Sequence, residues 1–179
     1  AKKREEIQEG FYSIAAIILV TSAVTSFLLL FSSKWIAALL FNDNIIIANI
    51  LSFIILVECI NSLVLNFFRT FQQIRKYSLF LSIQTVLNML FVAYFVLADY
   101  GINGAAIGIL ISKSLILIIT TSIIISKIGF KIPEFRNIKE YIAFGLPTVP
   151  GNLSSWVVTS SDRYIIGILL GTAYVGYYS

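Results

Sequence analysis

The sequence has no histidine, and Cys59 is its single cysteine. These absences exclude an intrachain disulfide, a histidine-based metal site and any catalytic triad that depends on histidine. No nucleotide-binding motif is present either, so the sequence does not indicate ATP hydrolysis. We therefore expect a chain without metal, cofactor or catalytic residues, and we do not predict an enzyme.

Charge is also scarce. Charged residues make up 12% of the chain, whereas about 25% is usual in soluble domains. The mean hydropathy is +0.91, and long apolar runs separate the few charges. A membrane-spanning helix needs about 20 mainly apolar residues. Five segments meet this requirement and predict an all-α, polytopic membrane protein: 11–31, 45–67, 77–98, 104–126 and 141–170.

The basic residues alternate between the two sides of these spans. Ten of the thirteen lysines and arginines lie before residue 11, in 68–76 or in 127–140. The opposite connections, 32–44 and 99–103, contain only Lys34. The positive-inside rule then places the N-terminus and both basic loops in the cytoplasm of a multi-pass cell (plasma or inner) membrane protein. No basic patch of the kind that binds nucleic acid is left over.

Two shorter features lie between the spans. Residues 35–41 are apolar but too few to cross a bilayer, so we expect them at the membrane interface with Trp35 at headgroup level. Gly104 and Gly108 form a pair of small residues one turn apart, which favours close approach of the fourth span to a neighbouring helix.

Two opposite charges are predicted near the middle of spans. Glu58 lies in the second span, and Lys113 lies in the fourth. Both spans run in the same direction, and the two residues differ in depth by roughly 6 Å. A lysine side chain can bridge that distance, so we hypothesise a Glu58–Lys113 ion pair. Glu58 is interpreted either as a cavity-facing acid or as a group sealed between helices, and Lys113 either as a cationic cavity residue or as a structural partner.

Three other polar residues are candidates for a solute pathway. Arg69 shares the helix face of Glu58, eleven residues further on. Gln84 and Asn88 are one turn apart in the third span. Uncharged amides in membrane helices either join neighbouring helices or line a cavity, and the sequence leaves both interpretations open.

The segment 141–179 combines an apolar composition with polar groups. At about 100° per residue, one arc of the helix contains Ser155 and four candidate pathway residues: Asn152, Thr159, Asp162 and Arg163. Ionisable groups inside a span normally face a cavity or a partner. Asp162 and Arg163 are alternatively an interfacial anchor whose arginine reaches towards water. Pro147 and Pro150 either start the helix or provide a bend within it.

The same segment resembles the seventh transmembrane helix of oligosaccharide flippases, the lipid-linked polysaccharide exporters of the multidrug/oligosaccharidyl-lipid/polysaccharide superfamily. The resemblance extends upstream to Phe68, Arg69, Gln72, Gln73, Lys76 and Tyr77, which are similar to the connection between the fourth and fifth helices of that family. The residues that carry it in the last segment are Gly145, Leu146, Pro147, Pro150, Asn152, Ser155, Trp156, Asp162, Arg163, Tyr164, Gly167, Leu170, Gly171 and 175–179.

This resemblance implies a transporter that flips a lipid-linked oligosaccharide from the cytoplasmic to the outer leaflet by alternating access. The family has about twelve to fourteen helices in two lobes around a central cavity. We therefore expect this chain, which begins without Met and ends at Ser179, to be a fragment. Residues 1–140 would belong to the first lobe, and residues 141–179 would form the first helix of the second lobe and the start of the following outer loop.

The expected partners are membrane lipid and a lipid-linked glycan, with polysaccharide-assembly proteins as further candidates. Cationic cavity residues such as Lys113 would suit a pyrophosphate-linked headgroup. Two alternatives stay open: a multidrug and toxin exporter of the same superfamily, and a membrane-embedded enzyme or scaffold of polysaccharide assembly.

Overall fold

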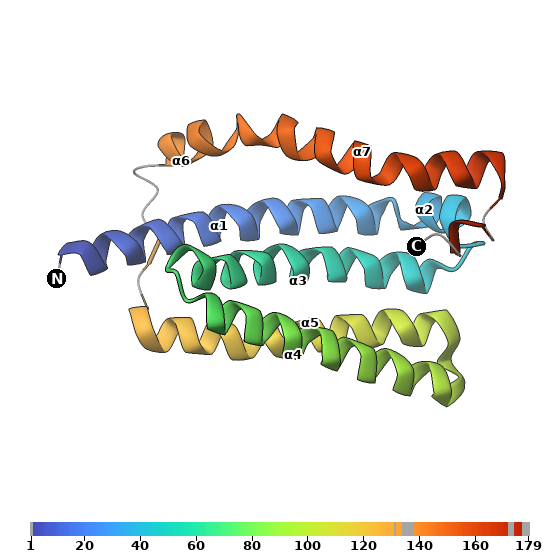
Figure 1. The fold of residues 1–179 in the computed structure, drawn as a ribbon, viewed down its shortest axis with the longest axis horizontal. Helices are drawn as coiled ribbons and strands as arrows, with labels where there is room; N and C mark the ends of the chain where they lie inside the picture. The colour runs from blue at the N-terminus through green and yellow to red at the C-terminus, as the bar shows by residue number, and fades with distance from the viewer. Residues whose placement is uncertain (1, 131, 134–137, 172–173, 177–179) are drawn as a thin grey trace. The chain divides into compact units, whose positions relative to one another are not determined.

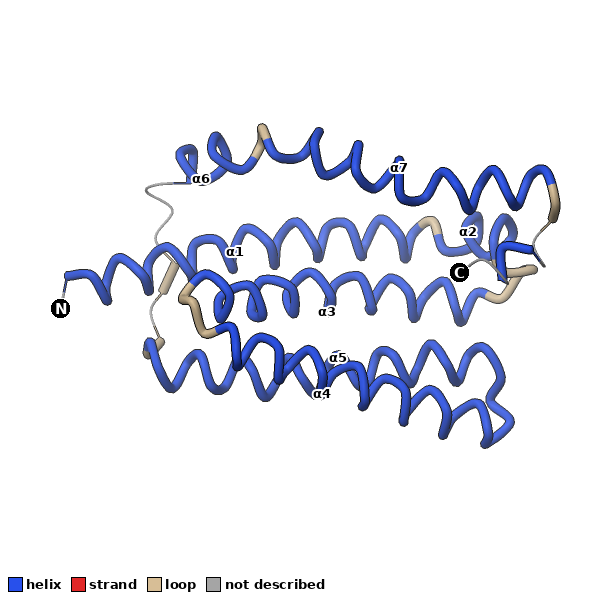
Figure 2. The backbone as a smooth tube through the Cα atoms, in the orientation of Figure 1, coloured by secondary structure: helices blue, strands red, loops and turns tan. Residues whose placement is uncertain are grey.

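The computed structural model describes residues 2–130, 132–133, 138–171 and 174–176. Two cations of the charge count lie outside the described residues, namely Lys131 and Arg136. The same holds for residues 177–179, which contributed to the family resemblance. The chain divides into two units, 1–134 and 135–179, whereas the sequence places the boundary after residue 140. The described residues form helices joined by turns and loops, with no strand among them (Figure 2).

The described residues of the first unit fold into long helices, the short helix α2 and the π-helical turn η1 (Val96–Tyr100) (Figure 1). The long helices are α1 (Lys2–Phe31), α3 (Ile45–Thr70), α4 (Ile74–Phe95) and α5 (Gly101–Ile128), and α2 (Ser33–Leu40) is short. We call the end of this unit where α1 and α4 begin and α3 and α5 end the basic end, because Arg69, Arg75, Lys76 and Lys127 lie there. These helices form where the sequence has its longest apolar runs.

Three stretches of the first unit are long and apolar enough to cross a membrane: Gln8–Phe31, Ile45–Thr70 and Ile74–Ile128. The third stretch is a helical hairpin, since Ala98 and Asp99 leave the helical conformation between α4 and α5. Asp99 has a φ of 64°, a left-handed conformation that aspartate tolerates better than most residues. The predicted first four spans therefore correspond to α1, α3, α4 and α5.

The connection between α1 and α3 contains α2, which includes most of the apolar segment 35–41. Trp35 is 83% exposed, so its side chain is accessible for the expected contact with lipid headgroups. Asn44 then caps α3, because its side-chain oxygen accepts a hydrogen bond from the Ile47 amide. The Asn44 side chain also donates to Asn103 Oδ1 at 3.1 Å, which ties the start of α3 to the start of α5.

Helix α5 packs against both α3 and α4. Gly104 and Gly108 of α5 lie against α4: a Cβ atom built on Gly108 would come within 2.9 Å of the Phe91 carbonyl carbon and the Val92 amide nitrogen. The predicted close approach at Gly104 and Gly108 is confirmed. A stripe of buried residues at every fourth position continues along the helix: Gly104, Gly108, Ser112, Ile116, Thr120, Ile124 and Ile128.

Large side chains replace the glycines toward the basic end. Phe68 is fully buried there and packs with Phe80 and Ile124 in one apolar cluster, which joins α3, α4 and α5. The Tyr12 hydroxyl of α1 donates a hydrogen bond of 2.7 Å to the Gly129 carbonyl, just past α5. Aromatic packing and the Tyr12–Gly129 hydrogen bond thus join segments of the basic end that are distant in sequence.

The second unit contains α6 (Ile138–Gly145) and α7 (Thr148–Leu169). The prediction of one helix over 141–170 is wrong in this respect, because the helix is interrupted between Gly145 and Thr148. Pro147 occupies the N-cap position of α7 and Pro150 lies in the first turn, where a missing amide donor costs least. Helix α7 is not among the membrane-length apolar stretches found in the described residues, since its charged and hydroxyl side chains lower its hydropathy.

Candidate functional site

The predicted ion pair between Glu58 and Lys113 forms in the structure. Lys113 Nζ lies 2.5 Å from Glu58 Oε2 and donates a hydrogen bond to it. Glu58 is near the middle of α3 and Lys113 near the middle of α5, so the contact joins two membrane-length helices far from their ends. The Lys113 side chain is 19% exposed and the Glu58 side chain is 49% exposed. The cation is therefore largely covered, while the carboxylate reaches the edge of the bundle.

An amide pair lies one turn further along α3. Asn61 is almost completely buried, and its side-chain nitrogen donates to Gln84 Oε1 of α4 at 3.2 Å. The Asn61 Oδ1 atom has no hydrogen-bond partner in the described structure. Gln84 thus joins α3 to α4, in agreement with the interpretation of such amides as contacts between helices.

Asn88 makes a second contact between helices. Its Oδ1 atom accepts a hydrogen bond of 3.3 Å from the Ser112 hydroxyl of α5. Ser112 is fully buried and continues the stripe of small residues after Gly108. Lys113, which pairs with Glu58 of α3, directly follows Ser112, so α5 makes polar contacts with α4 and with α3 through two successive residues.

A small groove opens beside the ion pair. Its volume is about 220 Å³, and most of its lining is polar. The groove connects the Glu58 carboxylate with the Gln84 amide, so the acid and one of the predicted pathway amides border the same space. Its lining residues are Glu58, Ser62, Leu65, Asn66, Tyr77, Leu81 and Gln84.

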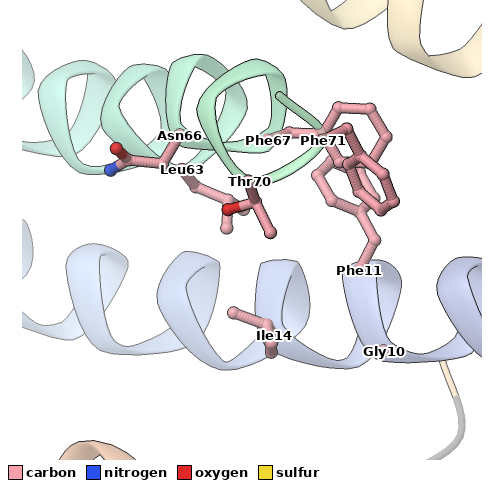
Figure 3. A pocket seen from close by; sticks show the side chains of 8 residues that line it. All are labelled: Gly10, Phe11, Ile14, Leu63, Asn66, Phe67, Thr70 and Phe71. Carbon is pink, nitrogen blue, oxygen red and sulfur yellow. The ribbon is translucent and has the colours of Figure 1, made fainter. Parts of the chain in front are cut away.

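A second groove of about 210 Å³ lies between α1 and α3. Figure 3 shows that Phe11 of α1, Phe67 of α3 and Phe71, just past α3, crowd one end of it. Asn66 and Thr70 are its polar lining residues, and it contains no charged side chain. This groove can accommodate an apolar group, but it offers no charge to a phosphate or sugar headgroup.

Arg69 is separate from the polar residues just described. It is exposed in the last turn of α3, and eleven residues of helix correspond to about 16 Å along the axis from Glu58. Its charge is favourable at a helix C-terminus. The predicted shared face of Glu58 and Arg69 therefore does not bring the two charges into contact.

The remaining predicted pathway residues belong to the second unit. Helix α7 runs without interruption through Asn152, Thr159, Asp162 and Arg163, so the predicted polar stripe lies on one helix. All four residues are exposed on that helix. The Thr159 hydroxyl donates to the Ser155 carbonyl of its own helix.

Sequence reasoning did not include Asn61, Ser112 or Asn66 among the candidate site residues. The signal for Asn61 was its position one turn from Glu58, and the signal for Ser112 was its four-residue spacing from Gly108. Metal binding has no support in the described part of the chain, where no group of three or more His, Cys, Asp or Glu side chains could hold an ion.

The long apolar helices, with charged and amide contacts between them, define an all-α polytopic membrane protein. The chain belongs to the polysaccharide biosynthesis protein family, because the model of that family matches residues 2–179. Membership assigns it a role in polysaccharide synthesis or export. Searches of curated proteins and of solved structures find no match.

Proposed function

We propose that this chain is part of a transporter that flips a lipid-linked oligosaccharide from the cytoplasmic to the outer leaflet of the cell membrane. The observation that carries the proposal is the Glu58–Lys113 ion pair in the middle of two membrane-length helices. Charges at such depth are costly and usually mark a pathway for a polar solute. The Glu58 side of the pair borders a polar groove, which supports this interpretation.

The geometry is compatible with an anionic headgroup as the solute. Lys113 is held by a carboxylate that is half-exposed, so an incoming pyrophosphate can compete with Glu58 for the ammonium group. The bond that the cation would make with phosphate is of the same charge-assisted kind as the bond it gives up. The neighbouring amide of Gln84 offers further hydrogen bonds to sugar hydroxyls in the same groove.

Transport rather than catalysis is part of this proposal. The polar groups near the pair are amides and hydroxyls that bond to neighbouring helices. Such groups can bind and release a headgroup without changing its covalent structure. Asp162 and Arg163 of α7 would contribute to the same pathway in the full transporter, and polysaccharide-assembly enzymes would supply and consume its substrate.

The test is a flipping assay with the full-length protein in sealed vesicles that contain a labelled lipid-linked oligosaccharide. Lys113→Ala should slow flipping at least about tenfold, because a hydrogen bond to a charged group contributes about 1.5–3 kcal/mol. Lys34→Ala serves as the control, since Lys34 is an exposed cation on α2. The double variant Glu58→Ala/Lys113→Ala removes both charges and keeps no unpaired one, so it separates loss of function from misfolding.

Unchanged flipping by Lys113→Ala would remove this residue from the pathway. No flipping by the intact protein would reject the transport function. Movement of amphipathic cations in place of the lipid-linked sugar would favour the drug-exporter alternative.

A further inference from the structure

Two grooves of the first unit meet at Asn66 of α3. One is the groove of about 220 Å³ beside Glu58, which we call the polar groove. The other is the groove of about 210 Å³ between α1 and α3, which we call the apolar groove (Figure 3). Asn66 lines both of them, and its side-chain nitrogen donates a hydrogen bond of 3.4 Å to the hydroxyl of Ser62 in the polar groove. The two grooves therefore adjoin at Asn66.

The lining of the apolar groove suits hydrocarbon. Toward the basic end it is closed by three aromatic rings, since the ring centres of Phe11 and Phe67 lie 5.1 Å apart and those of Phe67 and Phe71 lie 4.5 Å apart. Ile14 of α1 and Leu63 of α3 add aliphatic surface. No charged side chain is among the described residues that line this groove. Surfaces of this kind gain from contact with methylene groups.

The two grooves lie at different depths of the membrane-length stretches. Glu58 is near the middle of Ile45–Thr70, whereas the apolar groove takes its α3 residues from the last turns of that stretch and its α1 residues from the first turns of Gln8–Phe31. Nine residues separate Glu58 from Phe67, which corresponds to about 14 Å along the helix. In the orientation that the charges predict, the apolar groove lies in the cytoplasmic leaflet. A molecule that fills both grooves thus has its polar part near the midplane and its apolar part in that leaflet.

We infer that the apolar groove binds the first part of the hydrocarbon chain of the lipid-linked substrate, next to the headgroup that the polar groove receives. This inference rests on the proposed function and adds the chain to it. The Asn66 amide has two donor hydrogens, so it can bond to the linking phosphate while it keeps its bond to Ser62. A membrane phospholipid keeps its phosphate at the surface, so its acyl chain would cover the apolar groove and leave the polar groove empty. A lipid whose headgroup enters the bundle fills both grooves.

Photo-crosslinking of the full-length protein in sealed vesicles tests this inference. The probe is geranylgeranyl pyrophosphate that carries one N-acetylglucosamine and a photoreactive diazirine on the chain beside the pyrophosphate. Phosphatidylglycerol with a diazirine on its acyl chains is the comparison. Labelling of the peptide that contains Leu63 is divided by labelling near Val20, an exposed residue of α1 outside the groove. This ratio should be at least about fivefold higher for the probe than for phosphatidylglycerol, and a large excess of the probe without its diazirine should lower it.

A groove-filling variant adds a second measurement. Ile14→Trp occupies the apolar groove and should reduce probe labelling of the Leu63 peptide about tenfold, the effect of excluding roughly two methylene groups from contact. Val20→Trp adds the same side chain at the exposed position and should change this labelling by less than about twofold. The wild-type ratio needs no variant, so the inference is tested even where Ile14→Trp does not fold.

Three results would overturn the inference. Equal ratios for the two lipids would mean that phospholipid fills the groove, labelling by neither lipid would mean that protein covers it, and unchanged labelling in a folded Ile14→Trp variant would place the chain elsewhere. Failure of the proposed function gives a different result. Groove labelling by the probe without flipping in the same vesicles would keep the binding site and reject transport, whereas flipping without groove labelling would keep transport and reject the chain site.

Discussion

Glu58 and Lys113 are exposed to different extents, and this difference bears on how each substitution affects stability. Glu58→Ala leaves an ammonium group that is largely covered by protein, whereas Lys113→Ala leaves a carboxylate that already reaches the edge of the bundle. Uncompensated charge is more costly where it is less solvated. We therefore expect Glu58→Ala to lower the thermal unfolding temperature of the detergent-solubilised protein more than Lys113→Ala.

The double variant Glu58→Ala/Lys113→Ala completes a double-mutant cycle with the two single variants. Because the pair is partly exposed, we expect a coupling energy of about 1 kcal/mol between the two substitutions. Equal effects of the single variants would contradict the predicted difference between them, and strict additivity would mean that the two side chains do not interact in the folded protein.

Substitutions in the Asn61–Gln84 amide pair should also differ in their cost to stability. Gln84→Ala removes the partner of the buried Asn61 amide and should cost about 1–3 kcal/mol, the desolvation penalty of an unsatisfied polar group. Asn61→Leu removes an oxygen that has no partner in the described structure and replaces the amide with an apolar group of similar size, so it should cost less. Equilibrium unfolding of both variants shows which one loses more unfolding free energy. A larger loss in Asn61→Leu would mean that Asn61 Oδ1 has an essential partner.

Sequence reasoning anticipated the ion pair but not the amide pair, for a geometric reason. The depth of a residue in a span follows from counting along the helix, so Glu58 and Lys113 could be matched without knowing which faces meet. The Asn61–Gln84 contact depends on the rotation of α3 about its axis relative to α4, and a single sequence does not contain that angle.

At the scale of the elements, the contact between α4 and α5 depends on the absence of a side chain at Gly108. Gly108→Ala would place a methyl group 2.9 Å from backbone atoms of α4, so the two helices must separate. We expect a loss of about 1–3 kcal/mol in unfolding free energy, as for other overpacked contacts.

Gly151→Ala in α7 is the matched control for this prediction. Its added methyl group would meet nothing within 4 Å, so the better helix propensity of alanine should stabilise the protein by about 0.5–1 kcal/mol. A Gly108→Ala variant that unfolds at the wild-type temperature would contradict close packing of α4 on α5.

The long helices were predictable because each contains a mainly apolar run of membrane length, bounded by charges or turn residues. The interruption between α6 and α7 was not, since Gly145 and Leu146 continue the apolar pattern through it. Prolines in a first turn are compatible with both a helix start and a bend, so only the backbone distinguishes a new helix from a continued one.

At the scale of the whole molecule, the charge distribution predicts which end of the first unit faces the cytoplasm. A Cys59→Ser background allows single cysteines to be placed at Asp43 and at Gln72, which lie at opposite ends of α3. We expect a membrane-impermeant maleimide to label Asp43→Cys in intact cells and to label Gln72→Cys only after permeabilisation. The reverse pattern would invert the orientation, and labelling at both positions in intact cells would contradict a span between them.

The stretch Gln8–Phe31 contains 24 residues and the stretch Ile45–Thr70 contains 26, which correspond to about 36 and 39 Å of helix. The hydrocarbon core of a typical bilayer is about 30 Å thick. Helices of this length must lean away from the normal or extend into the headgroups. The activity of the protein should consequently depend on the acyl-chain length of the host bilayer, and thin bilayers should impose the largest helix tilt.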